Sequence, residues 1–267
     1  MKKIGLIAGG GKFPIIFAKA AREKGVSIVA VAFKEETSLE LEKAVDKIYW
    51  ISIAELKKLI GIFKSEGVKK AVMAGRVTKT WLFKDTPKPD PALESLLKNV
   101  SDKSDISLLR SAARVLRFFG ITLIDSTIFL KDILPAKGIL TKRVPTKEEW
   151  DDIKFGFSLA KATSRLEIGQ TVVVKNKVIL AIEAIEGTDK AILRGGELGN
   201  GSVVIVKTAR PNQDRRFDIP TIGPDTIRSL KEAGGSVLAI EARSTIFIDK
   251  DECVSLADSN NLSLVVV

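Results

Sequence analysis

The sequence contains no histidine and a single cysteine among its 267 residues. The absence of histidine excludes a Ser-His-Asp triad, a Cys-His pair, a zincin motif and a histidine general base. One cysteine excludes an internal disulfide and a cysteine-based zinc site. Because no histidine can activate its thiol, we interpret Cys253 as a small buried hydrophobic residue. Any chemistry is therefore expected to depend on carboxylates and a divalent metal ion.

Long apolar runs are also missing. Residues 1–11 (MKKIGLIAGGG) place two lysines before an apolar stretch that is too short for a signal peptide, and no A-x-A site follows. No run reaches the roughly 18 apolar residues of a membrane-spanning helix. Together with the lack of disulfides, these absences predict a cytoplasmic protein.

The net charge of +10 is compatible with nucleic acid, an anionic membrane surface or phosphorylated substrates. The lysines are scattered along amphipathic segments, only 6% of the residues are aromatic, and no RNA-binding signature occurs. We interpret most of the charge as a solvated surface and expect no nucleic-acid partner. Peripheral contact with the inner membrane surface stays open.

The first half of the chain predicts a parallel β-sheet. Short apolar runs of the kind that suits strands buried on both faces alternate with helical patterns. Pro14 opens the first helix, where its missing N–H costs nothing, and Gly25 ends it. This βαβ alternation predicts a Rossmann-like nucleotide-binding domain over residues 1–131. The expected strands are 3–8, 28–33, 71–74 and 121–124, and the later helices 53–65 and 106–119.

Residues 132–146 contain two prolines and a glycine without clear periodicity, which predicts a linker. Thr146 then begins a capping box with Glu149, and an apolar stripe at helical spacing follows. Residues 147–267 are expected to form a mixed α/β catalytic domain. Its expected elements are a hairpin at 170–174 and 178–185, a helix from Thr188 to 195–196, strands at 202–208, 237–240, 245–248 and 263–267, and helices at 224–233 and 250–259.

A glycine-rich loop, residues 9–12, joins the first expected strand to the first helix. Glycine backbone N–H groups beside a helix N-terminus favour an anion site, and parallel sheets bind ligands at this place. Phe13 departs from a Walker A loop and Pro14 from the dinucleotide fingerprint, so a simple tight turn stays an alternative. Glu35 and Glu36, after the second strand, could take the place of a ribose-binding acid.

The first acidic cluster is EAIEGTD at residues 183–189. Alternation along the strand puts Glu183 on one face with Ile179, Ala181 and Ile185. A carboxylate on an apolar face costs about 2–7 kcal/mol unless it is paired or bound to a metal. We therefore consider Glu183 a functional candidate. Thr188 and Asp189 have a structural alternative, as cap and first-turn acid of the next helix.

The second cluster lies within KTARPNQDRRFDIPTIGPDT, residues 207–226. Asp214 and Asp218 could ligate a hard cation such as Mg²⁺ or Mn²⁺. Lys207, Arg215 or Arg216 could bind a phosphate. The alternative is a surface loop held together by Asp–Arg pairs. The two clusters together suit metal-assisted attack of water on a phosphoryl group.

At these residues the chain resembles the bacterial UDP-2,3-diacylglucosamine pyrophosphatases that are unrelated to calcineurin-like phosphoesterases. The resemblance covers the whole chain. Its most specific parts are EAIEGTD and QDRRFDIPTIGP, at 183–189 and 213–224. GLIAGGGKFP at 5–14, AGRV at 74–77 and ILPAKGILT at 133–141 accompany them.

The resemblance implies two domains that bind substrate between them. It implies Mg²⁺-dependent hydrolysis of a UDP-linked diacyl sugar to UMP and 2,3-diacylglucosamine 1-phosphate in lipid A biosynthesis, and leaves a homodimer open. The implied catalytic residues are Asp218, Asp214 and Glu183, with Asp214 and Asp218 as metal ligands. The implied substrate-binding residues are Gly9, Gly10, Gly11, Lys12, Arg76, Asp105, Glu186, Thr188, Asp189, Lys207, Gln213 and Thr221.

The sequence departs from the family pattern in two places. Lys103 and Ser104 replace a glycine and an acid, so that only Asp105 matches, and residues 125–127 (DST) stand where a histidine and an acid are usual. These departures affect the predicted identity of the lipid substrate more than the predicted class of reaction. An apolar groove for acyl chains is expected near residues 81–83 or 118–119.

Two other classes of function stay open from the sequence. One is a nicotinamide-dependent oxidoreductase, against which Pro14 and the lack of a clear catalytic acid–base pair weigh. The other is a non-enzymatic regulator that binds a nucleotide or a lipid.

Overall fold

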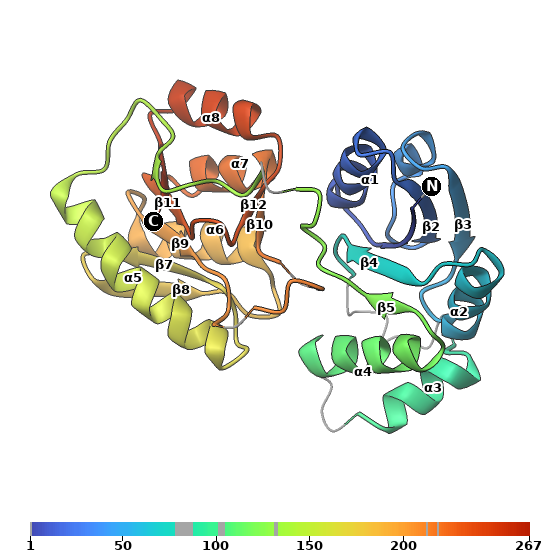
Figure 1. The fold of residues 1–267 in the computed structure, drawn as a ribbon. Helices are drawn as coiled ribbons and strands as arrows, with labels where there is room; N and C mark the ends of the chain where they lie inside the picture. Colours follow the sequence, from blue (N-terminus) through green and yellow to red (C-terminus); the bar gives the residue numbers. More distant parts are fainter. Residues whose placement is uncertain (1, 78–87, 101–104, 131–132, 212, 218) are drawn as a thin grey trace. The chain divides into compact units, whose positions relative to one another are not determined.

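The computed structural model describes residues 2–77, 88–100, 105–130, 133–211, 213–217 and 219–267. The chain forms two compact units, each with its own sheet and core (Figure 1). The first comprises Met1–Lys131 and Asp214–Asp218, and the second Asp132–Gln213 and Ile219–Val267. The predicted fold class, a parallel-sheet domain followed by a mixed α/β domain, is confirmed. Within the described residues, no helix combines the length and apolarity that crossing a membrane requires.

The first unit is built on a five-stranded sheet in which every pair of neighbours is parallel. Its order is β3-β2-β1-β4-β5. Strands β2 and β3 thus follow on one side of β1 and strands β4 and β5 on the other, so the order of the strands reverses between β1 and β4. Ligands of open parallel sheets bind at the carboxyl ends of the strands at such a reversal. The strands are β1 (Lys3–Ala8), β2 (Ser27–Phe33), β3 (Lys47–Ile51), β4 (Lys70–Ala74) and β5 (Thr122–Leu123).

Strand β3 was not predicted from the sequence. It lies at the edge of the sheet, and most of its side chains are half-buried or exposed. An edge strand does not need the continuous apolar run that marks the interior strands β1 and β2.

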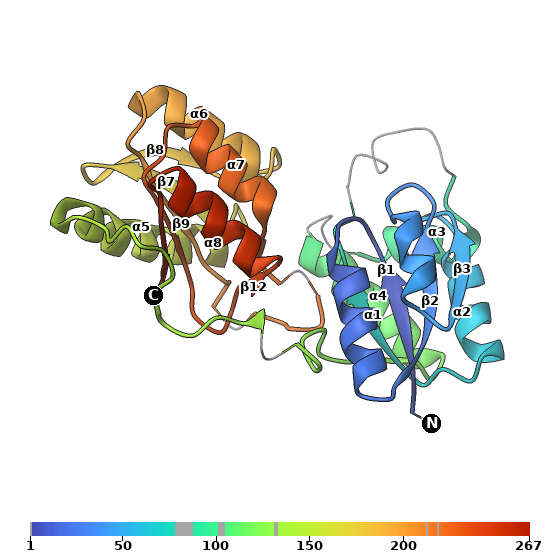
Figure 2. The ribbon, with the colours of Figure 1, turned by 90° about the horizontal axis from the view of Figure 1, so that it is seen from above.

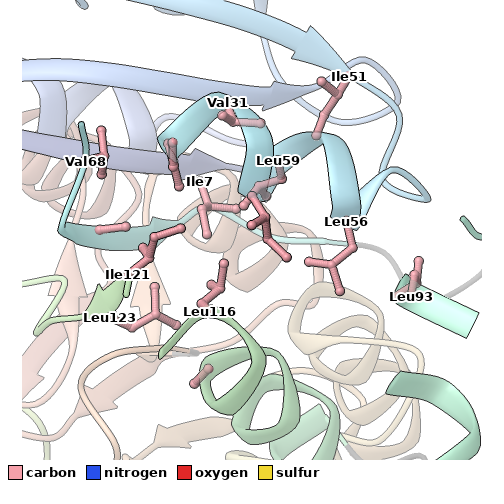
Figure 3. Packing of buried hydrophobic residues seen from close by; sticks show 14 of the residues in the cluster. Ile7, Val31, Ile51, Leu56, Leu59, Val68, Leu93, Leu116, Ile121 and Leu123 are labelled. Carbon is pink, nitrogen blue, oxygen red and sulfur yellow. The ribbon is translucent and has the colours of Figure 1, made fainter. Parts of the chain in front are cut away.

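Helices cover both faces of the first sheet. α1 (Phe13–Glu23) contacts β1, β2 and β4, and Pro14 stands in its first turn as predicted. On the other face, α2 (Leu56–Ser65), α3 (Pro91–Lys98) and α4 (Asp105–Phe118) share one apolar cluster with the strands (Figure 3). A short 3-10 helix, η1 (Leu39–Lys43), precedes β3.

The second unit contains a six-stranded mixed sheet of order β6-β13-β11-β9-β7-β8. Its centre, β13-β11-β9, is parallel, whereas β6, β7 and β8 run antiparallel to their neighbours. The strands are β6 (Gly138–Ile139), β7 (Thr171–Lys175), β8 (Val178–Ile182), β9 (Val204–Lys207), β11 (Val237–Ile240) and β13 (Ser263–Val266). β10 (Thr221–Ile222) and β12 (Ile246–Phe247) form a separate parallel pair.

Helices cover both faces of this sheet (Figures 1 and 2). α5 (Lys147–Arg165) packs on β7 and β9, and the predicted capping box of Thr146 and Glu149 starts it. α6 (Thr188–Gly199) and α7 (Pro224–Glu232) pack on the opposite face. α8 (Lys250–Ser259) packs against α7.

The predicted end of α6 at Gly195 and Gly196 is wrong, because the helix continues to Gly199. A Cβ at residue 195 would lie 2.5 Å from Val173 Cγ1, and one at residue 196 would lie 2.3 Å from the carbonyl oxygen of Ala233. These two glycines therefore allow close packing of the helix and do not terminate it.

A short piece of the second half of the sequence belongs to the first unit. Phe217 is buried in the apolar cluster that α2, α3 and α4 share with the first sheet. The N–H and Oγ of Ser126 both donate to the carbonyl oxygen of Arg215, at 2.9 and 3.0 Å. The described part of this segment, residues 214–217, therefore sits at the carboxyl end of β5.

Candidate active site

The glycine loop of the first unit packs backbone to backbone against the loop after β4. The Gly9 N–H donates to Ala74 O at 2.9 Å, and Gly10 exchanges two hydrogen bonds with Arg76, of 2.7 and 3.0 Å. A Cβ on Gly9 would lie 2.5 Å from the Arg76 carbonyl oxygen. Gly75 has a φ of +90°, and its Cβ would lie 2.6 Å from the Gly10 carbonyl oxygen. The two loops thus touch at the reversal point between β1 and β4.

This packing changes the expected role of the loop. The N–H groups of Gly9 and Gly10 bind protein carbonyls, so they are not directed at an anion as the sequence suggested. Gly11 has a φ of +85° with open space around its Cβ position, and Lys12 follows as the N-cap residue of α1. The Glu36 carboxylate lies 3.4 Å from the Cβ position of Gly10. A phosphate is therefore better placed beside Gly11 and Lys12 than beside Gly10.

We expect Gly9→Ala to lower the free energy of unfolding by about 1–3 kcal/mol, because its methyl group would clash with a backbone oxygen. Gly61→Ala is the matched control, since nothing lies within 4 Å of its Cβ position in α2. It should raise stability by about 0.5–1 kcal/mol. Urea unfolding of both variants measures the difference. Equal effects of the two substitutions would contradict the close packing described for the loop.

Asp214 makes a forked ion pair with its near neighbour Arg216. Arg216 Nε donates to Asp214 Oδ1 at 2.9 Å, and Nη2 donates to Oδ2 at 2.6 Å. Hydrogen bonding to Arg216 holds the pKa of Asp214 below its usual range, although partial burial opposes the shift. In this structure both oxygens of Asp214 are thus engaged, as the Asp–Arg alternative from the sequence supposed. The ion pair with Arg216 uses part of the acceptor capacity of the Asp214 carboxylate, which has about four lone pairs in all.

In the second unit, three polar side chains line up across adjacent strands. Thr171 pairs with Lys207 in the β7–β9 ladder, and the N–H of Glu183 donates to Thr171 O at 2.9 Å. Residues opposite one another in antiparallel strands share a face. Glu183, Thr171 and Lys207 therefore form one row on the face covered by α6, at the carboxyl ends of β8 and β9.

Thr188 connects the two ends of this row. Lys207 Nζ donates to Thr188 Oγ1 at 2.6 Å, and Thr188 Oγ1 donates to Glu183 Oε1 at 2.8 Å. The expected capping role of Thr188 is wrong, since α6 begins at this residue with Gly187 as its N-cap. Gly187 has a φ of +86°, which favours glycine. The Thr188 hydroxyl is thereby available to Lys207 and Glu183.

Two oxygens in this row are buried and bond to no described residue: Glu183 Oε2 and Thr171 Oγ1. Lys207 is only 6% exposed, and among the described residues no carboxylate lies within 4.0 Å of its Nζ. An unpartnered buried polar atom costs about 1–3 kcal/mol. The row thus contains an ammonium donor and a carboxylate oxygen that the described residues leave unsatisfied. Both groups could bind a ligand. We refer to Thr171, Glu183, Thr188 and Lys207 as the polar row.

The apolar environment predicted for Glu183 is only partly correct. Ala181 is buried on its face, but Ile179 is 39% exposed and Ile185 88% exposed. A bulge in the β7–β8 ladder breaks the strict alternation before Ala181, and the strand ends at Ile182.

The other predicted residues belong to both units and lie outside the polar row. Arg194 Nη2 donates to Glu186 at 2.7 Å and lowers its pKa. Asp189 is exposed in the first turn of α6, as its structural alternative supposed. Gln213 closes a turn with Arg210. Thr221 begins β10, Asp105 begins α4 and Arg76 is exposed beside the glycine loop. Asp218 and residues 81–83 lie outside the described residues.

Sequence reasoning missed Thr171, a member of the polar row. A threonine that starts a valine-rich strand is also explained by β-propensity, so no local signal distinguishes it. Only the register of three strands brings it beside Glu183 and Lys207.

Comparison with known proteins gives matches along the whole chain. A family model described as the LpxI N-terminal domain matches residues 3–133, and one described as the LpxI C-terminal domain matches residues 136–265. The UDP-2,3-diacylglucosamine pyrophosphatase LpxI of Caulobacter vibrioides is 28% identical over 279 residues, covering 100% of this chain and 98% of that protein.

Similarity to solved structures is slight. The biotin carboxylase domain of Hydrogenobacter thermophilus 2-oxoglutarate carboxylase, with MgADP, is 14% identical at a TM-score of 0.28, over 74% of this chain and 41% of that one. The biotin carboxylase subunit of a pyruvate carboxylase is 16% identical at a TM-score of 0.28, over 70% and 39%. The chain thus spans about two fifths of these proteins, and the similarity is too low to bear on the site.

Proposed function

The chain belongs to the LpxI family, and on this basis we propose that it hydrolyses the pyrophosphate bond of UDP-2,3-diacylglucosamine. The products would be UMP and 2,3-diacylglucosamine 1-phosphate, for lipid A biosynthesis. The matches to both family domains and to the Caulobacter vibrioides enzyme support this activity. We further propose that the protein acts in the cytoplasm or at the inner membrane surface, where its lipid substrate would lie.

The polar row is the observation that best supports a phosphoryl reaction. Lys207 is a buried ammonium group, and charge held in a dry site stabilises a phosphoryl transition state more than the same charge in water. The N-terminus of α6 begins at Thr188 and adds partial positive charge. We propose that Lys207 binds a phosphate oxygen and that Thr188 fixes the orientation of both Lys207 and Glu183.

The described residues fit a magnesium ion in one respect. Glu183 Oε2 is a buried carboxylate oxygen that bonds to no described residue, and Mg²⁺ is commonly held by one or two carboxylates together with substrate phosphates. No group of three or more acidic or cysteine side chains that could hold a metal ion by itself occurs among the described residues. When bound, Mg²⁺ or Mn²⁺ would neutralise phosphate charge and acidify a water molecule.

The roles proposed for the other residues rest on the resemblance of the sequence to this family. We propose Asp218 as the essential carboxylate and, with Asp214, as a further metal ligand. For the nucleotide, we propose that Gly11 and Lys12 receive a phosphate and that Arg76 contacts the same part of the substrate.

The test is UMP release from UDP-2,3-diacylglucosamine by the purified protein with Mg²⁺, Mn²⁺ or EDTA. We expect release with a metal ion, its loss in EDTA, and its return when excess Mg²⁺ is added. Full activity in EDTA would contradict the metal dependence. No release under any condition would contradict the proposed reaction.

A further inference from the structure

An ion pair outside the polar row joins α5 to the end of β11. Lys161 Nζ lies 2.7 Å from both Oε1 and Oε2 of Glu241. The side chains are only 24% and 19% exposed. Neither residue carries a sequence signal of function, and neither belongs to the residues assigned above to catalysis or binding.

This pair holds both polar backbone groups of one residue. The N–H of Ala209 donates to Glu241 Oε2 at 2.7 Å, and the carbonyl oxygen of Ala209 accepts from Lys161 Nζ at 2.8 Å. Ala209 is buried two residues beyond the end of β9. Buried backbone groups need partners, and here two charged side chains supply them where the sheet no longer does.

Ala209 lies just beyond the point where Lys207 ends β9. The ladder between β9 and β11 ends with the Glu241 N–H donating to Lys207 O at 3.2 Å. The Thr208 N–H then donates to Gln170 O at 2.9 Å, and the chain turns at Arg210 and Gln213. Lys161 of α5 and Glu241, which directly follows β11, thus bind the backbone of the stretch that follows Lys207.

We propose that Lys161 and Glu241 are positioning residues for the reaction, which hold the path of the chain after β9 and thereby the site of Lys207. The proposal rests on the hydrolysis proposed above. Displacement of a reacting group by about 1 Å can cost about 100-fold in rate. The ion pair touches neither the Lys207 ammonium nor the Glu183 carboxylate, so its effect passes through the backbone of residues 207–209.

Glu241→Ala and Glu241→Gln form the test, with steady-state kinetics of UMP release. We expect Glu241→Ala to lower kcat about 100-fold with KM changed less than about threefold. Glu241→Gln should stay within about tenfold of the native kcat, because an amide oxygen can still accept from the Ala209 N–H. Should Glu241→Ala not fold, Lys161→Met carries the same expectation, since it removes the donor to the Ala209 carbonyl oxygen.

Glu149→Ala is the matched control. The Arg143–Glu149 pair has the same 2.7 Å separation and similar exposure, 20% and 14%, but it lies at the start of α5. The Glu149→Ala variant should have a lower melting temperature and an unchanged kcat. Equal losses of kcat in the Glu149 and Glu241 variants, assayed where both are folded, would overturn the positioning role.

Amide hydrogen exchange separates this proposal from the proposed hydrolysis. The Ala209 amide should exchange faster in Glu241→Ala than in the native protein or in Glu149→Ala, whether or not the protein releases UMP. Unchanged exchange at Ala209 would overturn the role of the pair. Absent UMP release from the native protein, with faster exchange in the variant, would overturn the reaction and leave the ion pair as the holder of the segment.

Discussion

Lys207→Met is expected to lower kcat for UMP release about 10³-fold. Lys207 lies almost wholly buried at the end of β9, with its Nζ 2.6 Å from Thr188 Oγ1. Methionine has a similar length and no charge, so the substitution removes the phosphate-binding ammonium and keeps most of the packing. Loss of one preorganised charge donor in a dry site costs about 10²–10³-fold in other enzymes, and a full charge belongs at the upper end.

Lys175→Met provides the control for the loss of a half-buried lysine in the same sheet. Lys175 Nζ donates to the carbonyl oxygens of Gly199 and Gly201, at 2.7 and 2.9 Å, at the far end of α6 from Thr188. We expect a lower melting temperature and an unchanged kcat. If Lys207→Met kept the native kcat, or if Lys175→Met lost as much activity, Lys207 would not be a phosphate-binding group.

The interior of each unit was predictable because periodicity reports burial. The apolar runs of β1 and β2, the helical stripe of α5 and the Thr146 capping box all appear where the sequence indicated them. Features that depend on a neighbour were missed or misassigned. The two glycines inside α6 resembled a helix stop, because the sequence does not show that Val173 and Ala233 press against them.

The candidate site was predictable as a set of residue types and not as a set of contacts. EAIEGTD identified Glu183 and Thr188, but their partners Thr171 and Lys207 come from strands that pair only in the folded sheet. The QDRRF stretch predicted a functional role for Asp214. In the structure, Arg216 lies two residues away and donates a hydrogen bond to each oxygen of Asp214. Charge density in a sequence therefore locates a candidate loop, and hydrogen bonding decides which carboxylate is free.

That distinction makes Glu183 the more informative carboxylate to replace. Thr188 donates to its Oε1, and its buried Oε2 bonds to no described residue. Glu183→Gln keeps the shape and one acceptor oxygen for Thr188. The amide nitrogen that replaces the second oxygen donates hydrogen bonds and cannot bind a cation.

We expect Glu183→Gln to lower kcat about 10²–10³-fold while its melting temperature stays the same or rises. An unsatisfied buried carboxylate oxygen destabilises the folded protein, so a neutral amide should relieve that cost. Reduced activity with undiminished stability is characteristic of a group retained for function. A rise in the Mg²⁺ concentration needed for half-maximal activity would assign the loss to metal binding.

Glu197→Gln is the control, because Glu197 is exposed on the same helix that Thr188 begins. Both its kcat and its melting temperature should match those of the native protein. If Glu183 had only a structural role, Glu183→Gln would lower the melting temperature and leave kcat unchanged, which is the opposite of our expectation. Because the two accounts predict opposite changes in two measured quantities, one thermal melt and one rate series on this variant decide between them.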